Sequence, residues 1–551
     1  MTDTPDRPIF WTMSAQASQV RAILGPEGVL VRALPGFSFR RSQLDMALLL
    51  SRAFEEDLPA IVEAGTGTGK TFGYLVPVIL SGKKAVLSTA TKNLQEQIFF
   101  KDLPLLRQAT DLRVDAVIMK GRRNYLCLHK YHQQFSQSSF LESGKEHLRR
   151  QLEEWISHTE QGDFAELSWI EEGDPILAAL SCPSDECLGG DCLFLDECFL
   201  GNLRNRAARA RLIVVNHHLF FADLKVKQGG FGEIIPRFQV AIFDEAHAVE
   251  ETATAYLGER WSTHQVMELV RDLEREIEDG EGSDKRRIQE CMRGLKAGIE
   301  RLKGFFSGRG DKERMDPEVL SGLREGPARD IRRDLKALGQ DSGISERDDL
   351  RIQALFFRAA ELSRTLDDVV KERKGGWLNW YEQRKRALVL HASPLDISAP
   401  MKEQLYRRVR SVAFASATLS TAGTFEFIRR RLGIPDEALE GLFPSEFDFE
   451  RQALMYIPRD LAKPGSPAFA EEAASRILDI IGRTQGRMLA LFTSYNNLNL
   501  VHEILDGRIP YAVYRQGDAP RSALLEAFKQ DIHSVLLATG SFWQGVDVPG
   551  E

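Results

Sequence analysis

Short apolar runs rich in β-branched residues alternate along the chain with segments whose apolar residues recur at helical spacing. The runs lie at Ile61, Ala85 to Thr89, Val114 to Met119, Leu212 to Val215, Val240 to Phe243 and Val412 to Ala415. Strands that alternate with helices in this way are typical of a parallel sheet covered on both faces. The pattern therefore predicts an α/β domain with a doubly wound parallel sheet.

Two insertions interrupt this pattern, and a second α/β unit follows it. Residues 121–205 carry clustered cysteines, and residues 250–376 are rich in charged helical segments such as "ELVRDLEREIED". Beyond residue 440, the runs "RMLALFTS", "YAVYR" and "SVLLATG" predict further strands. We expect a first α/β domain at 1–120, 206–249 and 377–440, a cysteine domain at 121–205, a helical domain at 250–376 and a second α/β domain at 441–551.

Composition and the N-terminal sequence argue against a membrane-spanning protein and against a secreted one. The 551 residues are 43% hydrophobic and 28% charged, and no apolar run approaches the roughly 20 residues that span a bilayer. The N-terminus "MTDTPDRPIFWTMSAQ" lacks the basic and then apolar order of a signal peptide, so we expect a cytoplasmic protein with reduced cysteines. The net charge of −8 leaves room for a local basic groove, because steering depends on how charge is distributed.

The segment "VEAGTGTGKT", residues 62–71, lies between an apolar run and a helical segment. In a strand, glycine turn and helix, backbone N–H groups bind phosphates, so Gly65, Thr66, Gly67, Thr68 and Gly69 are predicted to surround a nucleotide. Lys70 would reach the β- and γ-phosphates, and Thr71 would bind Mg²⁺. Ala64 stands where the general phosphate-loop pattern has its first glycine. The alternative is a glycine-rich surface turn.

The segment "QVAIFDEAHAVE" supplies the carboxylates that phosphoryl transfer requires. The apolar run from Val240 to Phe243 would bring Asp244 and Glu245 to the carboxyl edge of the sheet, where ligands bind in such folds. Asp244 is predicted to hold Mg²⁺, and Glu245 to orient and deprotonate the attacking water.

With these motifs, the chain resembles the superfamily 2 helicases of the XPD/DinG iron–sulfur group, and most of all the bacterial YoaA-type DinG-like helicases. The resemblance implies that Gln43 in "RRSQLDMA" hydrogen-bonds the adenine base and that His247 joins the catalytic set. Thr89 in "LSTATKNLQEQI" would touch the nucleic-acid backbone. Ser416 and Thr418 in "ASATLS" would couple hydrolysis to movement, and Gln544 and Asp547 in "LATGSFWQGVDVPG" would bridge nucleotide and strand.

The resemblance further implies two RecA-like motor domains, with the helical insertion as an arch domain. The expected activity is ATP-dependent 5′→3′ movement on single-stranded DNA and unwinding of forked DNA, in repair or replication. No Q-x-x-G-R-x-x-R segment follows Gly550, so the second motor domain is expected to be incomplete. The alternatives are an RNA helicase, a translocase that does not unwind DNA, and a redox-sensing clamp that binds ATP and DNA.

Four of the six cysteines fall in "SCPSDECLGGDCLFLDEC". Four thiolates suit either tetrahedral zinc or an iron–sulfur cluster, and His129 and His132 lie nearby in sequence, so chemistry alone leaves both open. The resemblance implies a [4Fe–4S] cluster on Cys127, Cys187, Cys192 and Cys198. Cys182 is either a spare thiol near the cluster or a substitute ligand, and we expect it to be dispensable. Cys291 lies in an amphipathic helical segment and is predicted to be a packed hydrophobe.

Basic side chains recur in "KGRRN", "RNRAARAR" and "IRRR". Each group is either a solvated helix face or a phosphate contact. The sequence does not decide between these readings.

Overall fold

The computed structural model describes residues 14–136, 143–167, 169–170, 173–183, 186–229, 233–277, 283–339, 350–373, 375–384, 387–543, 546 and 548. The chain forms two compact units. The first contains Met1–Asp163 and Ile176–Glu446, and the second contains Phe164–Pro175 and Phe447–Glu551. None of the described helices is long and apolar enough to cross a membrane.

The first unit is built on a seven-stranded sheet in the order β11-β1-β10-β5-β2-β4-β3, in which all pairs are parallel. The strands are β1 (Ala60–Ala64), β2 (Ala85–Thr89), β3 (Ala116–Ile118), β4 (Leu212–Asn216), β5 (Val240–Asp244), β10 (Ser411–Ser416) and β11 (Leu439–Phe443). The six predicted strands are present, which confirms the parallel α/β fold. The edge strand β11 was not predicted.

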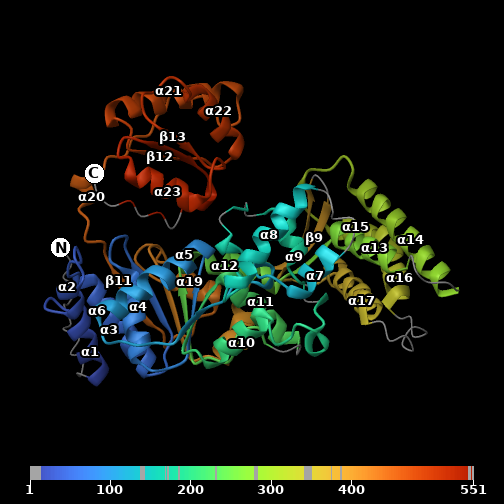
Figure 1. The fold of residues 1–551 in the computed structure, drawn as a ribbon, viewed down its shortest axis with the longest axis horizontal. Coiled ribbons are helices and arrows are strands. Elements are labelled where there is room, and N and C mark those ends of the chain that lie inside the picture. The colour runs from blue at the N-terminus through green and yellow to red at the C-terminus, as the bar shows by residue number, and fades with distance from the viewer. Residues whose placement is uncertain are drawn as a thin grey trace. The chain divides into compact units, whose positions relative to one another are not determined.

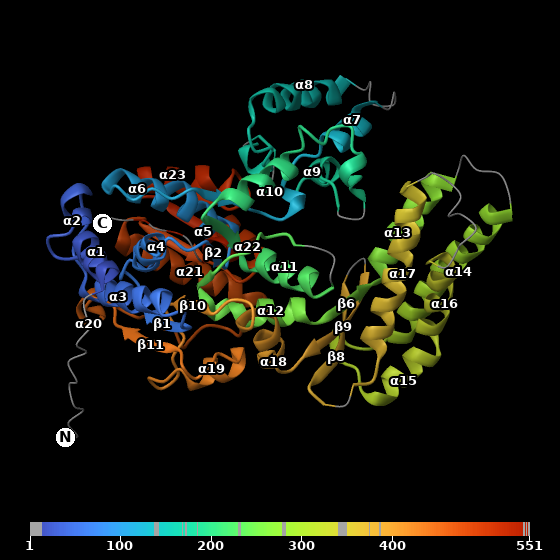
Figure 2. The ribbon, with the colours of Figure 1, turned by 90° about the horizontal axis from the view of Figure 1, so that it is seen from below.

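Helices cover both faces of this sheet, as Figures 1 and 2 show. One face packs against α1 (Ala15–Leu24), α2 (Val29–Ala33), α3 (Arg41–Glu55), α4 (Lys70–Leu80) and α6 (Leu103–Ala109). The other face packs against α10 (Phe199–Arg209), α11 (His217–Gly229), α12 (Val249–Leu257), α18 (Ser398–Met401) and α19 (Glu426–Leu432). The short helix α5 (Lys92–Gln97) follows β2. Burial on both faces explains why the central strands consist of apolar residues without alternation.

The cysteine domain leaves the sheet after β3 and returns before β4. Its helices in the described residues are α7 (Leu128–Ser136), α8 (Ser143–His158) and α9 (Pro175–Leu180). Loops and α10 then lead the chain back to β4. Tyr125 is buried at its base, where its hydroxyl accepts a hydrogen bond from the Lys120 N–H at 2.9 Å.

The arch-like domain combines helices with a small sheet, seen together in Figure 2. The helices are α13 (Thr263–Ile277), α14 (Ser283–Phe306), α15 (Pro317–Glu325), α16 (Pro327–Gly339) and α17 (Leu350–Val370). They share one hydrophobic core, which includes Trp261 and Tyr381 from the sheet. Cys291 is buried in this core, as predicted.

The sheet of this domain corrects one predicted boundary. Four antiparallel strands run in the order β6-β9-β8-β7: β6 (Glu259–Ser262), β7 (Lys312–Arg314), β8 (Trp377–Arg384) and β9 (Ala387–Pro394). Residues 377–394 were assigned to the first motor domain, but they pair with strands of the arch-like domain. The second boundary is also shifted, because β11 pairs with β1 and so places residues 441–443 in the first sheet.

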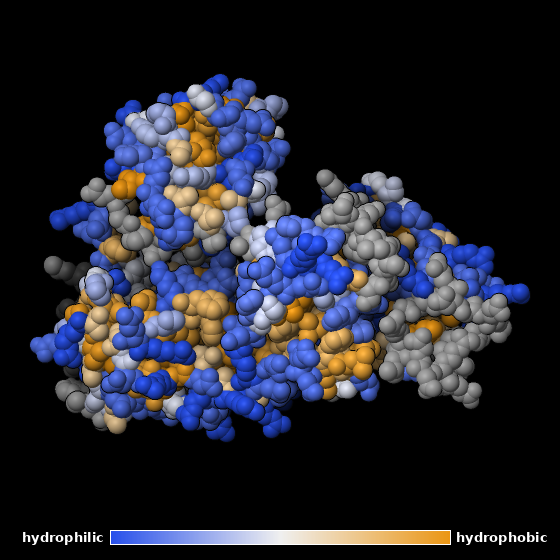
Figure 3. All heavy atoms as spheres, viewed as in Figure 1, coloured by the Kyte–Doolittle hydropathy of each residue, from blue (hydrophilic) through white to orange (hydrophobic). Residues whose placement is uncertain are grey.

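The second unit contains a parallel sheet in the order β12-β14-β13. These strands are β12 (Met488–Leu491), β13 (Val513–Arg515) and β14 (Val535–Ala538), and they match the predicted runs. The helices are α20 (Phe449–Gln452), α21 (Pro467–Thr484), α22 (Tyr495–Leu505) and α23 (Arg521–Gln530). Strand β14 is buried, whereas β12 is half-buried, and hydrophobic side chains are visible on the face of this unit drawn in Figure 3.

Candidate active site

The predicted phosphate loop joins β1 to α4. Gly67 and Gly69 have φ values of 81° and 76°, a left-handed region that favours glycine. A Cβ atom at Gly69 would lie 2.2 Å from Gln43 Nε2, so this position has no room for a side chain. The buried Thr68 hydroxyl donates to the Gly65 carbonyl at 2.8 Å and closes the turn. The loop therefore has the backbone conformation of an anion-binding turn at a helix N-terminus.

Gln43 connects helix α3 to this loop. Its side chain is fully buried, and Nε2 donates to the Gly69 carbonyl at 2.9 Å. Its Oε1 atom has no hydrogen-bond partner among the described residues. A buried acceptor without a donor is costly, and the exocyclic amine of adenine would satisfy it. The structure thus suits the predicted base contact.

Lys70 begins helix α4, and its Nζ atom lies 3.4 Å from the Ala64 carbonyl. Its positive charge favours the ionised forms of both Asp244 and Glu245: it opposes the rise that burial causes in the pKa of Asp244 and helps to lower that of Glu245. The three predicted groups therefore share one electrostatic environment. Thr71 follows Lys70 in the first turn of the helix and is half-buried. Helix α4 and strand β5 thus bring the predicted phosphate and carboxylate residues to the same edge of the sheet.

Asp244 ends β5 and is buried. Burial, with the charge of Glu245 as a second cause, raises the pKa of Asp244 to about 7. Its Oδ2 accepts a hydrogen bond from the Thr89 hydroxyl at 3.3 Å. A buried carboxylate opposite a phosphate loop fits a Mg²⁺ ligand, because a divalent cation would compensate the charge that burial penalises. The contact places Thr89 beside the predicted magnesium ligand, a relationship that the sequence did not predict.

Glu245, His247 and Ser416 form a connected group. His247 Nδ1 lies 2.9 Å from Ser416 Oγ and 3.4 Å from Glu245 Oε2, and Ser416 Oγ lies 3.4 Å from the same Glu245 atom. Burial opposes ionisation of Glu245, but the hydrogen bond with His247 and the charge of Lys70 hold its pKa below the ordinary value. The same hydrogen bond raises the pKa of His247. Glu245 is therefore held as a carboxylate.

The strand order explains this meeting of distant segments. Strand β10 lies between β1 and β5, with Glu63 in register with Ser416 and Ala415 in register with Asp244. Carboxyl ends of neighbouring parallel strands meet at one edge of the sheet. The end of β10 is consequently adjacent to both the phosphate loop and the carboxylate pair.

Comparisons with known proteins identify the family of this chain. A model of the helicase C-terminal domain matches residues 477–551. The ATP-dependent DNA helicase YoaA of Escherichia coli (strain K12) is 34% identical over 527 residues, which cover 96% of this chain and 82% of the relative. The protein of the same name from Haemophilus influenzae is 32% identical over 543 residues, which cover 97% of this chain and 83% of the relative. The chain belongs to the YoaA and DinG helicase family. Among solved structures, an XPD helicase resembles it with a TM-score of 0.49 and 17% identity, over 91% of this chain and 80% of that one.

Two residues of this family member lie at the site without having been predicted. Glu63, at the end of β1, accepts hydrogen bonds from the Leu419 and Ser420 N–H groups, both at 2.6 Å, and from the Ser420 hydroxyl at 3.0 Å. It thereby ties the loop after β10 to the strand before the phosphate loop. An acidic residue next to the phosphate loop was the only sequence signal.

His217 is the second unpredicted residue. It begins α11, is fully buried, and its Nδ1 lies 2.7 Å from Ser88 Oγ. Burial lowers its pKa to about 3, so this histidine is neutral. It packs against Phe243 immediately before Asp244, with ring centroids 5.8 Å apart, and so supports the end of β5.

The structure describes one of the three other residues that were predicted to couple hydrolysis to movement or to bridge nucleotide and strand. Thr418 is exposed, and its N–H lies 3.5 Å from Ser416 Oγ. Gln544 and Asp547 lie outside the described residues.

The predicted cluster ligands all belong to one small domain. Cys127 and Cys182 hydrogen-bond each other, which lowers the pKa of Cys127 to about 6. Cys187 is exposed, and Cys192 is half-buried. Cys198 caps α10, where its Sγ accepts from the Gly201 N–H at 3.4 Å. Within the part of the chain that the structure describes, no group of three or more Cys, His, Asp or Glu side chains converges to hold a metal. The donor chemistry suits an iron–sulfur cluster, but the ligand arrangement stays a prediction.

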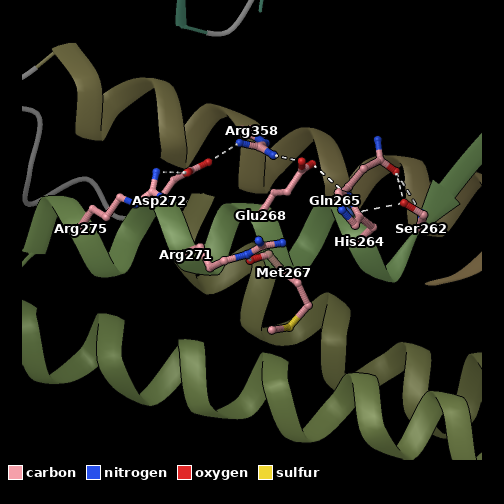
Figure 4. Close-up of polar contacts among 9 residues, drawn as sticks. All are labelled: Ser262, His264, Gln265, Met267, Glu268, Arg271, Asp272, Arg275 and Arg358. Atoms are coloured by element: carbon pink, nitrogen blue, oxygen red, sulfur yellow. Dashed lines mark hydrogen bonds and ion pairs between the residues drawn. The ribbon is translucent and has the colours of Figure 1, made fainter. Parts of the chain in front are cut away.

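A cavity of about 260 Å³ lies where the cysteine domain meets α13 and α17. Arg123, Arg271, Arg275 and Arg358 line it, together with Glu186, Glu268 and Asp272. Figure 4 shows Arg358 reaching from α17 to Asp272, at 2.8 Å, and toward Glu268, at 3.6 Å. Arg358 is therefore neutralised, while Arg123 and Arg271 are exposed on the cavity wall.

Proposed function

We propose that this chain is an ATP-dependent DNA helicase that moves 5′→3′ along single-stranded DNA and unwinds forked duplexes, in DNA repair or replication. The observation that carries the proposal is the contact group of Glu245, His247 and Ser416. This group connects Glu245, the carboxylate suited to hydrolysis, to the end of β10, and β10 leads into the loop that follows it. The names of the YoaA relatives, both ATP-dependent DNA helicases, support the same activity.

At the nucleotide, the phosphate loop and Lys70 bind the phosphates, and Gln43 Oε1 accepts from the adenine amine. Thr71 and Asp244 would hold Mg²⁺, which when bound neutralises charge on the phosphates. Glu245 accepts the proton of the attacking water, and His247 keeps Glu245 ionised for that role. Because phosphoryl transfer depends mostly on positioning and charge, these side chains suffice for the first domain's share of the reaction.

Movement would follow from the protonation of Glu245 during hydrolysis. When Glu245 gains a proton, its hydrogen bonds with His247 and Ser416 weaken, because charge-assisted bonds are roughly twice as strong as neutral ones. Ser416 is followed by the loop that Glu63 holds through two backbone N–H groups. The loop after β10 is therefore the element whose position responds to hydrolysis, with Thr418 on its exposed side.

For the cysteine domain we propose a [4Fe–4S] cluster on Cys127, Cys187, Cys192 and Cys198. Spacing and the clustering of thiols support the proposal, and when bound such a cluster would cross-link the two ends of the insertion. The domain would act as the wedge that separates strands. Arg123 and Arg271, on the wall of the arginine-lined cavity, are suited to phosphates of the displaced strand.

The test is unwinding of 5′-tailed, 3′-tailed and forked DNA by the full-length protein with ATP and Mg²⁺. We expect unwinding of the 5′-tailed and forked substrates and none of the 3′-tailed one. Stimulation of ATP hydrolysis by RNA but not by DNA would contradict the proposed substrate. Tight binding of ATP and DNA without stimulated turnover would instead support a clamp.

A further inference from the structure

A second cavity lies at the opposite edge of the first sheet, at the amino ends of β2, β3 and β4. Its volume is about 320 Å³, within the lower range of small-ligand sites. Lys83, Arg113, Arg209 and Arg211 line it, and Asp115 is the carboxylate among its described lining residues. Ile79, Val114 and Leu212 form an apolar part of its wall.

The basic side chains of this cavity are unevenly compensated. Lys83 Nζ pairs with Asp57 at 2.7 Å, and Arg211 Nη1 donates to the Gly82 carbonyl at 3.1 Å. Arg113 and Arg209 are exposed, and their side chains form no hydrogen bond or ion pair with another described residue. The cavity therefore presents more positive charge than the protein neutralises.

The backbone around the cavity is fixed by hydrogen bonds. Helix α10 ends at Arg209, and Lys84 Nζ donates to the carbonyls of Ala207 and Ala208, both at 2.8 Å. The N–H of Arg211 donates to the Asp115 carbonyl at 2.9 Å, which links the start of β4 to the start of β3. Arg209 and Arg211 are two of the four arginines in the "RNRAARAR" segment, so half of that basic group lines this cavity and not the nucleotide site.

We propose that this cavity binds a terminal phosphate, the dianion of a phosphomonoester, attached to a group of nucleotide size. Guanidinium groups suit a phosphate because they donate paired hydrogen bonds in a fixed plane. Arg113 and Arg209 approach from different segments and bind the free oxygens, while Arg211 is held in place by Gly82. The apolar wall accommodates the sugar or base. The phosphate belongs either to a free nucleotide or to the 5′ end of a DNA strand.

This site is separate from the ATP site. Strand β2 runs from Ala85 at the cavity to Thr89 beside Asp244, a length of roughly 13 Å at about 3.3 Å per residue. A ligand of nucleotide size in the cavity therefore does not reach Lys70. The two sites can be altered independently.

The test measures adenosine 5′-monophosphate binding by calorimetry in a Lys70→Ala background, which takes away the lysine that contacts phosphates at the first site. We expect one binding event that adenosine does not produce. The double variant Arg113→Gln/Arg209→Gln should weaken it at least about tenfold, because two charge-assisted hydrogen bonds are lost. Both residues are exposed, so the fold should be retained. The matched control is Arg408→Gln/Arg410→Gln, which removes two exposed arginines that do not line the cavity.

A second arm compares 5′-phosphorylated and unphosphorylated single-stranded DNA. A preference for the phosphorylated strand that disappears in Arg113→Gln/Arg209→Gln identifies the strand end as the source of the phosphate. Binding of the mononucleotide alone identifies a free nucleotide. Absence of any phosphate-dependent binding, or equal effects of the test and control variants, would overturn the proposal.

Discussion

His247 Nδ1 lies 2.9 Å from Ser416 Oγ, although 169 positions separate the two residues in the chain. The contact exists because β10 is inserted between β1 and β5, so that its end meets the "DEAH" turn. Glu245 in this turn has φ of 51°, a left-handed conformation that is uncommon for a residue with a side chain. Such strain concentrates at functional sites, and here it directs Glu245 toward both partners.

Ser416→Ala should separate hydrolysis from movement. The variant removes the hydroxyl that joins both His247 and Glu245 to β10, but it keeps the side chains of Lys70, Asp244 and Glu245. We expect ATP binding to be retained and the unwinding rate to fall about fivefold, with a smaller loss in ATP hydrolysis, because one hydrogen bond is worth about 1 kcal/mol. Thr421→Ala, at an exposed position on the same loop, serves as the control. Equal losses in hydrolysis and unwinding would show that Ser416 has no coupling role.

Glu245→Gln should bind ATP normally and hydrolyse it about 10² to 10⁴ times more slowly, since the amide cannot accept the proton from water. Nucleotide binding by calorimetry and single-turnover hydrolysis are the measurements. A loss of binding affinity instead of rate would assign Glu245 a structural role.

Much of this site could be predicted because its motifs are local. The phosphate loop and the "DEAH" turn each combine an apolar run with chemistry-bearing residues in sequence, and both lie at the expected sheet edge. Glu63 could not be predicted, because its partners at 419 and 420 are more than 350 positions away. Residues 377–394 were misassigned because a strand's composition does not reveal which sheet it joins; pairing with β6 and β7 decides that.

The stability of the arch-like domain should vary with pH because of His391. This residue of β9 stacks on Trp380 with ring centroids 3.8 Å apart and lies opposite Arg260 of β6, and the charges of Lys312 and Glu382 also act on it. Burial, followed by the charge of Arg260, lowers the pKa of His391 to about 4. Between pH 6.5 and 4 the unfolded chain takes up a proton that the folded chain does not, so stability falls as pH falls.

His391→Phe keeps an aromatic ring but cannot titrate. Its melting temperature should therefore fall less than that of the unsubstituted protein between pH 7 and pH 5. His147→Phe, at an exposed position on α8, is the control and should retain the original pH dependence. The same decrease in all three proteins would show that His391 does not contribute.

Metal content should distinguish the cysteines that bind the cluster from Cys182, which is expected not to bind it. We expect Cys187→Ser to lose iron and Cys182→Ser to retain it, after anaerobic purification and elemental analysis. The contact between Cys182 and Cys127 makes this a stringent comparison, because Cys182 is close enough to replace a ligand. Loss of iron in Cys182→Ser would change the ligand set, and stoichiometric zinc without iron would exclude the cluster.

The central claim is that the phosphate loop and the "DEAH" carboxylates form a DNA-dependent ATPase. The most direct measurement is the ATP hydrolysis rate of the full-length protein and its Lys70→Ala variant, with single-stranded DNA, with RNA and without nucleic acid. The account predicts strong stimulation by DNA in the unsubstituted protein and no turnover in Lys70→Ala, because removal of such a charge costs several kcal/mol in the transition state. Near-normal DNA-stimulated turnover in Lys70→Ala would contradict it.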